Sequence, residues 1–289
     1  MSFSNDIDIG KAQYSKSSQF YRLRFQDGSF VVSGKISNVT RAAMNGTSAC
    51  ASLRFTVPVD LKGYFHLNGF GTSTDIHFED TVSCNTFYLY GCKANVHLYK
   101  GKTGSDTSPS YTPAIYTHVI LEADNALDTP MKSTTIGDGG ILDLNGHDQI
   151  FNYFWNVGGY SANGTMTSPL DKPGKLTIKY HSKAQTNNCA ITGNFSLEFI
   201  GPNCTKPMTF AKSVSTTVGD LTLSKGPVKI VIQDGAQFTR LGSLSLDAKT
   251  QLTLTADGGD CRARSIYLTT GCTNNIAAGR VWRHCCSCS

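Results

Sequence analysis

Short triplets, built mostly as an apolar residue, a variable residue and a second apolar residue, recur along the whole chain. Alternation such as Leu252-Thr253-Leu254 points apolar side chains to one face of an extended strand and polar ones to the other. Nine of the ten intervals between triplets are 20 to 24 residues long, and the eleven triplets begin at residues 31, 53, 76, 96, 119, 142, 176, 197, 221, 244 and 266. The pattern predicts half-buried β-strands in a repeat of about 22 residues.

A second set of apolar positions runs out of phase with the triplets. Phe65 and Phe87, for example, are 22 residues apart, so each repeat is expected to contain at least two strands. Turn signals follow the same period, since Asp27-Gly28 and Asp138-Gly139 each precede a triplet by four residues. Helical periodicity is not sustained beyond about two turns, which argues against the crossover helices of an α/β fold.

A repeat with one apolar face cannot bury that face alone, so successive copies are expected to stack. The predicted fold is all-β: a single-stranded parallel β-helix (β-solenoid) of about eleven coils over residues 1–279, roughly 50 Å long at the usual strand spacing. Residues 1–30 are a candidate N-terminal cap, and residues 280–289 are expected to be an irregular C-terminal tail or cap. The single interval of 34 residues predicts an inserted loop at 158–175, with a smaller loop at 100–113.

The charge distribution restricts the partners. The 289 residues carry a formal net charge of +5 that is spread along the chain, without a Lys/Arg run or an aromatic-interleaved basic stripe, so we expect no nucleic acid partner. No apolar run approaches the roughly 18 residues of a membrane-spanning helix. The first residues lack the basic start and apolar centre of a secretory leader, so we expect an intracellular protein or a piece of a longer chain.

Ten cysteines favour disulfides and an oxidising compartment, because cytosolic chains rarely carry so many without recognisable metal sites. The alternative is that several cysteines are small buried apolar residues. Near the C-terminus, His284 precedes Cys285 and Cys288, but one Cys-x-x-Cys pair is weak evidence for zinc, so no metal or cofactor is predicted. The spacings suit three local pairs: Cys84 with Cys92, Cys189 with Cys204, and Cys261 with Cys272.

The stretch 139–155 gathers four polar residues between two apolar runs: Asp143, Asn145, His147 and Asp148. Asn145-Gly146 is expected to form a corner, because both residues tolerate positive φ. The Gly lies too early for a calcium-binding EF-hand loop. We therefore interpret the stretch as a strand, a corner and a second strand, in which Leu142 and Leu144 point inward and the interior is regained at Ile150, Phe151, Phe154 and Trp155.

Two blocks within this region carry a family resemblance. VILEADNALDTP (119–130) and TTIGDGGILDLNGHDQIFNYF (134–154) resemble bacterial autotransporter-associated β-strand repeats, and residues 221–257 resemble their closing coils. The similarity covers about residues 115–257. It implies a right-handed β-helix exported across a membrane, usually without catalytic residues. The chain departs from the family in its high cysteine content and in lacking the pattern of a terminal outer-membrane barrel.

The function expected from these features is a non-catalytic secreted or cell-surface β-solenoid that displays loops for adhesion to glycans or to host and matrix surface proteins. End-to-end self-association is a further expectation, because coil ends leave strand edges open. No catalytic, cofactor-binding or metal-binding residue is assigned. An aromatic platform for sugars is considered for Tyr153, Trp155 and Tyr160, and a flat threonine array for ice or minerals has little support.

The alternative is a polysaccharide lyase or glycoside hydrolase, which needs paired carboxylates or an acid next to a basic residue. Residues about 22 apart should be neighbours on adjacent coils. Asp143 then faces Ile120 and Thr177, and Glu198 faces Thr177 and Thr222, so no acidic ladder appears. We interpret Asp124, Asp148 and Asp171 as solvated turn residues, and they are the first candidates for mutagenesis if activity is found.

Overall fold

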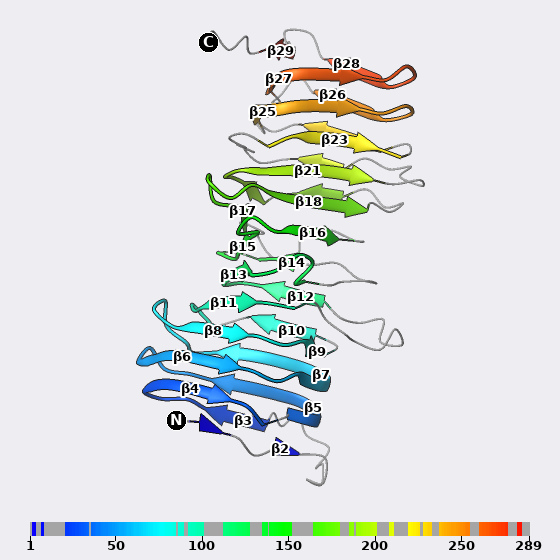
Figure 1. Ribbon diagram of the computed structural model, residues 1–289. Helices are drawn as coiled ribbons and strands as arrows, with labels where there is room; N and C mark the ends of the chain where they lie inside the picture. Colours follow the sequence, from blue (N-terminus) through cyan, green and yellow to red (C-terminus); the bar gives the residue numbers. More distant parts are fainter. Residues whose placement is uncertain are drawn as a thin grey trace.

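The computed structural model is a stack of β-strands with the two ends of the chain at opposite ends of the stack (Figure 1). In the part that it describes there are 29 strands and no helix. The described residues are 2–3, 7–8, 21–34, 36–84, 86–89, 92–100, 112–127, 135–137, 139–151, 164–179, 185–187, 189–200, 208–210, 219–225, 228–232, 237–254, 260–276 and 282–284.

Two sheets build the N-terminal half. Sheet I has nine strands in stacking order: β1 (Ser2–Phe3), β4 (Gly28–Val32), β6 (Cys50–Phe55), β8 (Asp75–Phe78), β11 (Asn95–Leu98), β13 (His118–Leu121), β15 (Ile141–Asp143), β17 (Thr165–Thr167) and β20 (Ala190–Ile191). Sheet II has eight strands: β2 (Ile7–Asp8), β3 (Tyr21–Arg24), β5 (Ile36–Asn45), β7 (Val59–Asn68), β9 (Val82–Ser83), β10 (Thr86–Leu89), β12 (Thr112–Ile115) and β14 (Thr135–Ile136).

Two further sheets continue the stack towards the C-terminus. Sheet III has seven strands: β16 (Asp148–Phe151), β18 (Gly174–Lys179), β21 (Phe195–Ile200), β23 (Leu221–Ser224), β25 (Gln237–Leu246), β27 (Asp260–Leu268) and β29 (Trp282–His284). Sheet IV has five strands: β19 (Gln185–Asn187), β22 (Met208–Phe210), β24 (Lys229–Ile232), β26 (Gln251–Leu254) and β28 (Thr273–Ile276).

Neighbouring strands in all four sheets pair in parallel, which confirms the all-β solenoid that the repeat predicts. Inward-pointing side chains form columns through the stack. Full burial of a Val, Leu, Ile, Phe or Met side chain stabilises the folded state by about 1.5–3 kcal/mol. Phe55 and Phe78 stack with ring centroids 4.8 Å apart, so one strand spacing also sets the distance between aromatic neighbours. One fully buried column in sheet I comprises Leu53, Ile76, Val96, Val119 and Leu142.

The interval of 34 residues between the triplets at 142 and 176 marks a change of face, which corrects the predicted insertion. Leu142 lies in sheet I, where its neighbour on the next coil is Met166, whereas Leu176 lies in sheet III. Residues 165–167 and 174–175 of the expected loop at 158–175 belong to β17 and β18. Residues 158–163, and 101–111 of the smaller expected loop, lie outside the described residues.

The expected coil number changes for the same reason. Eleven triplets were read as one column, but the first six lie in sheet I and the last five in sheet III. In the described chain sheet I holds nine strands and sheet III holds seven, so no single face shows eleven.

Both ends of the described chain join the stack. The strands within residues 1–30, the expected cap, pair in parallel with later strands: β1 with β4, and β2 and β3 with β5. Near the other end, β29 pairs with β27, so residues 282–284 of the expected tail form a strand.

The corner before each sheet I strand admits only small or carbonyl-bonding residues. Thr74 and Thr117 are buried there, and each hydroxyl donates a hydrogen bond of 2.6 Å to a carbonyl of the preceding coil. At the same corner one coil after Thr117, a Cβ on Gly140 would lie 2.3 Å from the carbonyl oxygen of Ile115. These contacts fix how each strand of sheet I enters the stack.

Candidate functional site

The outward face of sheet I carries a row of imidazole and carboxylate side chains. Because Ile76 and Val96 point into the core, His77 and His97 point outward on adjacent strands, directly opposite one another in the parallel register. The neighbours of these histidines in the same outward column are Arg54 on β6 and Ile120 on β13. Strand alternation and parallel register together therefore bring these polar side chains to one surface.

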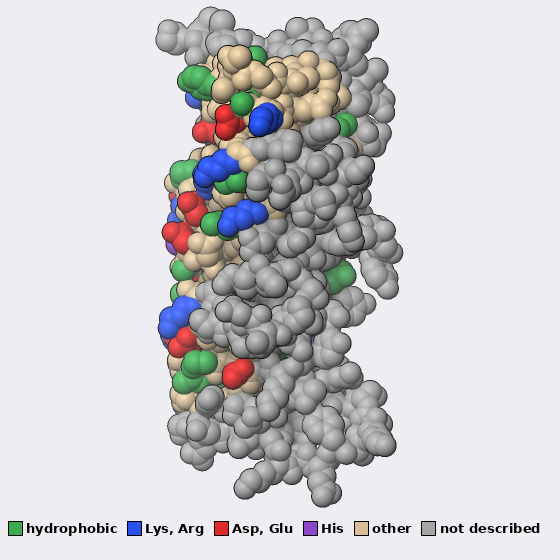
Figure 2. All heavy atoms as spheres, turned by 90° about the vertical axis from the view of Figure 1, so that its right-hand side faces the viewer, with side chains coloured by type: hydrophobic (Ala, Val, Ile, Leu, Met, Phe, Trp, Pro, Cys, Tyr) green, Lys and Arg blue, Asp and Glu red, His purple; other side chains and the backbone are tan. Residues whose placement is uncertain are grey.

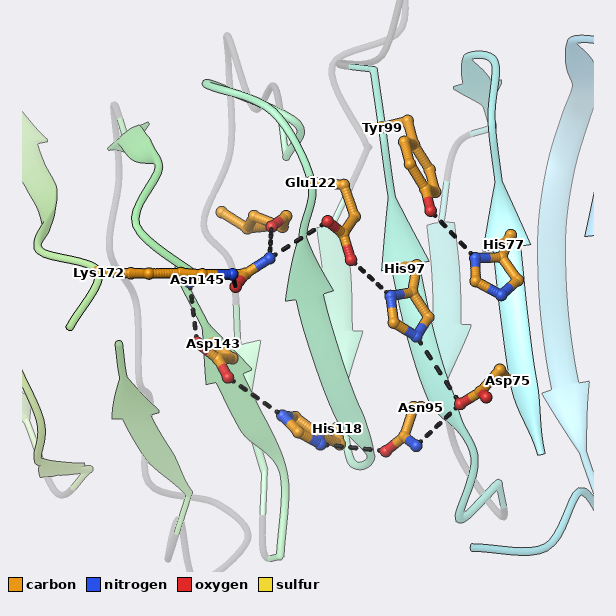
Figure 3. A network of polar contacts seen from close by, with 11 residues as sticks. Asp75, His77, Asn95, His97, Tyr99, His118, Glu122, Asp143, Asn145 and Lys172 are labelled. Carbon is orange, nitrogen blue, oxygen red and sulfur yellow. Dashed lines mark hydrogen bonds and ion pairs between the residues drawn. The ribbon is translucent and has the colours of Figure 1, made fainter. Parts of the chain in front are cut away.

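The rings of His77 and His97 stack, with centroids 4.5 Å apart and planes 18° apart. His77 Nδ1 lies 3.2 Å from the hydroxyl of Tyr99, which follows β11 (Figure 3). Beyond His77, Arg54 on β6 forms an ion pair with Glu79. The stacked imidazoles thus lie next to the Tyr99 phenol and to the ion pair that joins β6 to the turn after β8.

His97 has a carboxylate at each ring nitrogen. Its Nδ1 lies 2.7 Å from Glu122 Oε1, and its Nε2 lies 3.8 Å from Asp75 Oδ1 (Figure 3). The side chain of His97 is only 16% exposed and that of Glu122 only 23%, whereas that of Asp75 is 48% exposed. The imidazole therefore links a half-buried carboxylate to one that faces solvent.

The chain of contacts continues along the rod through amide groups. Asn95 donates from Nδ2 to Asp75 Oδ1 at 3.0 Å, and Asn95 Oδ1 lies 3.1 Å from His118 Nδ1. His118 Nε2 in turn lies 3.6 Å from Asp143 Oδ2 on β15. Since these residues belong to four different coils, the contacts connect strands that are far apart in the sequence.

At the corner after β15 the contacts return to Glu122. The Asn145 backbone donates to Asp143 Oδ1 at 2.8 Å, and the Asn145 side chain donates from Nδ2 to Glu122 Oε2 at 3.2 Å. Lys172 donates from Nζ to Asn145 Oδ1 at 3.1 Å. We call the set the imidazole strip; it comprises Asp75, His77, Asn95, His97, Tyr99, His118, Glu122, Asp143, Asn145 and Lys172 (Figure 3).

Two groups of the strip have displaced pKa values. Burial lowers the pKa of His77, and the nearby His97 and Arg54 act in the same direction, against Asp75 and Glu79. Burial also raises the pKa of Tyr99, as do the carboxylates of Glu122 and Glu79. At neutral pH both changes favour an uncharged His77 hydrogen-bonded to an uncharged phenol.

The corner that the sequence predicted within 139–155 is confirmed. Asn145 and Gly146 have φ of 49° and 85°, and Leu142 and Leu144 are fully buried. The strand that follows differs from the prediction. In β16, Phe151 is buried but Ile150 is 38% exposed, because strict alternation puts Gln149 rather than Ile150 inward.

The remaining predicted aromatic positions cannot be placed. Phe154 and Trp155 of the expected return to the interior, and Tyr153 and Tyr160 of the expected sugar platform, lie outside the described residues.

Two of the three acids chosen as first candidates for catalysis lie at one corner. Asp124 Oδ1 accepts a hydrogen bond from the Asp148 backbone at 3.0 Å and lies 3.2 Å from His147 Nδ1. These contacts, the backbone one first, lower the pKa of Asp124. Asp171 lies in the exposed turn between β17 and β18. The Asp124 carboxylate therefore holds this corner through the Asp148 backbone and the His147 side chain.

The expected disulfides are not formed in the described part of the chain. Cys92 and Cys272 are free thiols, which excludes the pairs with Cys84 and Cys261. Cys189 is fully buried, and its Sγ lies 3.9 Å from the carbonyl oxygen of Ile136, so this cysteine fills the core. Its expected partner, Cys204, lies outside the described residues. Cys285 and Cys288 lie outside the described residues. The cysteines described here act as small apolar core residues.

Acids in register do not reveal the strip, because most of its members are histidines, amides and other groups that are not acids. For Asp143, Ile120 is the neighbour on one side, as predicted, but Thr167 rather than Thr177 is the neighbour on the other. The neighbours predicted for Glu198, Thr177 and Thr222, are correct. A usable signal was present, since the triplets at 76 and 96 both have histidine in the middle, outward position.

Two further findings on the described residues concern metal-binding groups and membrane-spanning helices. Within the described ranges, no group of three or more His, Cys, Asp or Glu side chains is arranged to hold a metal ion, and the same part of the chain contains no helix that would cross a membrane. A side view shows cationic and anionic side chains close together along the described flank of the rod (Figure 2).

Comparison with protein-family models, curated proteins and solved structures finds no match.

Proposed function

We propose that the protein is a non-catalytic β-solenoid that binds an extended glycan along the imidazole strip. The observation that supports this is the strip itself: planar imidazole, carboxylate, amide and phenol groups follow one another over β8, β11, β13 and β15 on a sheet face. Such groups donate and accept hydrogen bonds in fixed directions, and a glycan presents many hydroxyl groups. The contact surface is then a sheet face, in addition to any displayed loops.

The geometry of the sheet suits a polymer better than a small molecule. Parallel strands repeat about every 4.8 Å along the rod, so a linear chain lying along the rod meets similar polar groups at regular steps. The contacts within the strip hold its side chains in place before a ligand arrives, which reduces the entropy lost on binding.

Binding is tested by immobilising a panel of neutral, acidic and amino polysaccharides, with matrix proteins as a second set, and measuring affinity by interferometry. We expect one or more glycans to bind and Glu122→Gln to weaken binding about tenfold, since the variant loses the charge that holds His97. Glu198→Gln is the matched control, because Glu198 is a half-buried carboxylate on sheet III with its own ion pair to Lys175 at 2.6 Å. Equal effects of the two variants, or binding to matrix proteins alone, contradicts the proposal.

A polysaccharide-cleaving enzyme is the second candidate, and the position of His97 favours it. This imidazole contacts Glu122 and Asp75 through its two ring nitrogens, and glycosidases use a pair of neighbouring carboxyl groups. Incubation with uronic acid polymers and neutral glycans, followed by analysis of unsaturated and reducing products, tests this candidate. Cleavage that Glu122→Gln abolishes would replace the binding proposal.

We further propose that the chain is exported to the cell surface or secreted, as in autotransporter-associated repeat passengers. The support is the motif similarity over residues 115–257 together with the parallel solenoid. Protease shaving of intact cells, followed by detection of the chain, tests this location. Digestion only after lysis contradicts the proposed surface location.

End-to-end self-association of rods stays a prediction, which sedimentation at several concentrations tests.

A further inference from the structure

The stacked pair of His77 and His97 is a site where two positive charges can arise in contact. The ring centroids are 4.5 Å apart, and the parallel register of β8 and β11 holds the two backbones at a fixed spacing. When one or both imidazoles are neutral, the rings attract by stacking. When both are protonated, like charges face each other at this distance across a surface that is only partly hydrated.

The surroundings of the two rings are unequal. His97 has a carboxylate near each nitrogen, Glu122 and Asp75, so a positive charge on it is balanced on both sides. His77 contacts the phenol of Tyr99 through Nδ1. The charged and titratable groups around His77 are Arg54 from β6, Asp75 and Glu79 from its own strand and the turn after it, His97 and Tyr99 from β11, and Glu122 from the end of β13.

We propose that the strip is an acid-sensitive binding surface, in which protonation of His77 against the stacked ring of His97 separates the two rings and releases the ligand. This inference rests on the proposed glycan binding for its ligand, but the ring separation is a property of the chain alone. The strip has three carboxylates and one lysine, a net charge of −2 with neutral imidazoles, and protonation of its three histidines changes this to +1.

The physical steps follow from the contacts. Protonated His77 carries an N–H at both ring nitrogens, so its Nδ1 can only donate to the Tyr99 oxygen, and the new charge is opposed by His97 and Arg54. Burial already lowers the pKa of His77, so this residue gains its proton at a lower pH than an ordinary imidazole. The rings then move apart, and the hydrogen-bonding directions that a bound glycan uses are lost.

The first experiment needs no ligand. NMR titration of the imidazole Hε1 protons of the whole chain, from about pH 8 to pH 5, is expected to show that protonation of His77 also changes the His97 signal, because the two rings are in contact. In His77→Gln, which keeps a hydrogen-bonding group next to Tyr99, this change in the His97 signal is expected to be lost. A His97 signal that responds in the same way in the wild type and in this variant overturns the proposal.

The second experiment measures affinity for a glycan identified by the polysaccharide panel over the same pH range. We expect the wild-type affinity to fall about tenfold on acidification, His77→Gln to fall less than about threefold, and His147→Gln, at a corner outside the strip, to follow the wild type. Equal losses in all three proteins overturn the switch and leave glycan binding intact. Coupled titration without any glycan binding supports the ring separation and contradicts the proposed function.

Discussion

The Gln149 side chain bonds to the backbone of the preceding coil. It is fully buried, and its Nε2 donates to the carbonyl of Leu127 at 2.7 Å while its Oε1 accepts from the Leu127 backbone at 3.0 Å. Asn125 Oδ1 likewise accepts from the Ile150 backbone at 3.0 Å. These side chains satisfy backbone groups at the edge of β16, where sheet III begins.

We expect Gln149→Leu to lower the free energy of unfolding by about 1–3 kcal/mol, although it adds an apolar side chain to the core, because the Leu127 N–H and C=O lose their partners. Ile150→Thr, on the adjacent exposed position, should change it by less than about 0.5 kcal/mol. Urea denaturation of both variants measures the difference. A stabilised Gln149→Leu variant would show that the hydrogen bonds contribute nothing net.

The lowered pKa of His77 predicts how stability depends on pH. Since its folded pKa lies below the ordinary imidazole value of about 6.5, the unfolded chain binds the proton more readily than the folded chain. Its contribution to stability is therefore complete above about pH 6.5 and is lost as the pH falls through the folded pKa. Denaturation midpoints at a series of pH values should decline less steeply in His77→Gln. If the midpoints of the wild type and of His77→Gln decline equally with falling pH, groups other than His77 cause the loss of stability.

The corners determine whether successive strands can stack. Thr74 and Thr117 satisfy carbonyl groups of the preceding coil, and Gly140 lets its own coil approach the carbonyl of Ile115. Sequence patterns identified the strands between the corners well, because alternation is a local property. They did not identify the corner column, because its members differ in type and share only their small size or their hydroxyl group.

At this corner we expect Gly140→Ala to destabilise the protein by about 1–3 kcal/mol, since the new Cβ meets a backbone oxygen of a packed strand. The penalty should exceed the gain from a less flexible unfolded chain. Ser52→Ala, on the outer surface of β6, is the control and should be nearly neutral. Thermal unfolding followed by circular dichroism compares the two, and an unchanged Gly140→Ala midpoint would contradict the close approach.

At the scale of the whole molecule, stacking rather than covalent linkage holds the coils together in the described chain. Columns of buried side chains run through sheets I and III, and Cys50, Cys92 and Cys189 belong to that interior. Burial raises the pKa of the Cys92 thiol to about 11, so little thiolate exists at neutral pH. Cys50, Cys92 and Cys189 thus contribute to the packing of the core.

Thiol labelling tests this arrangement. With iodoacetamide at about pH 8, we expect the Cys92 peptide to remain unlabelled in the native protein and to react fully in denaturant, because the thiol is both buried and protonated. Cys272, which is partly exposed, should react in the native state. Peptide mapping by mass spectrometry reads both sites in one sample, so Cys272 is the internal control. Rapid native labelling of Cys92 would contradict the buried position.

The sequence by itself determined the all-β stacked architecture and the corner at Asn145-Gly146, because alternation, a fixed repeat and tolerance of positive φ are local properties of the chain. Only the tertiary structure decided which face each triplet occupies, since the columns through Leu142 and Leu176 look alike in sequence but lie in different sheets. It also decided the imidazole strip. His77, Glu122 and Asp143 come together through register across several coils, and register depends on the exact length of every turn between them.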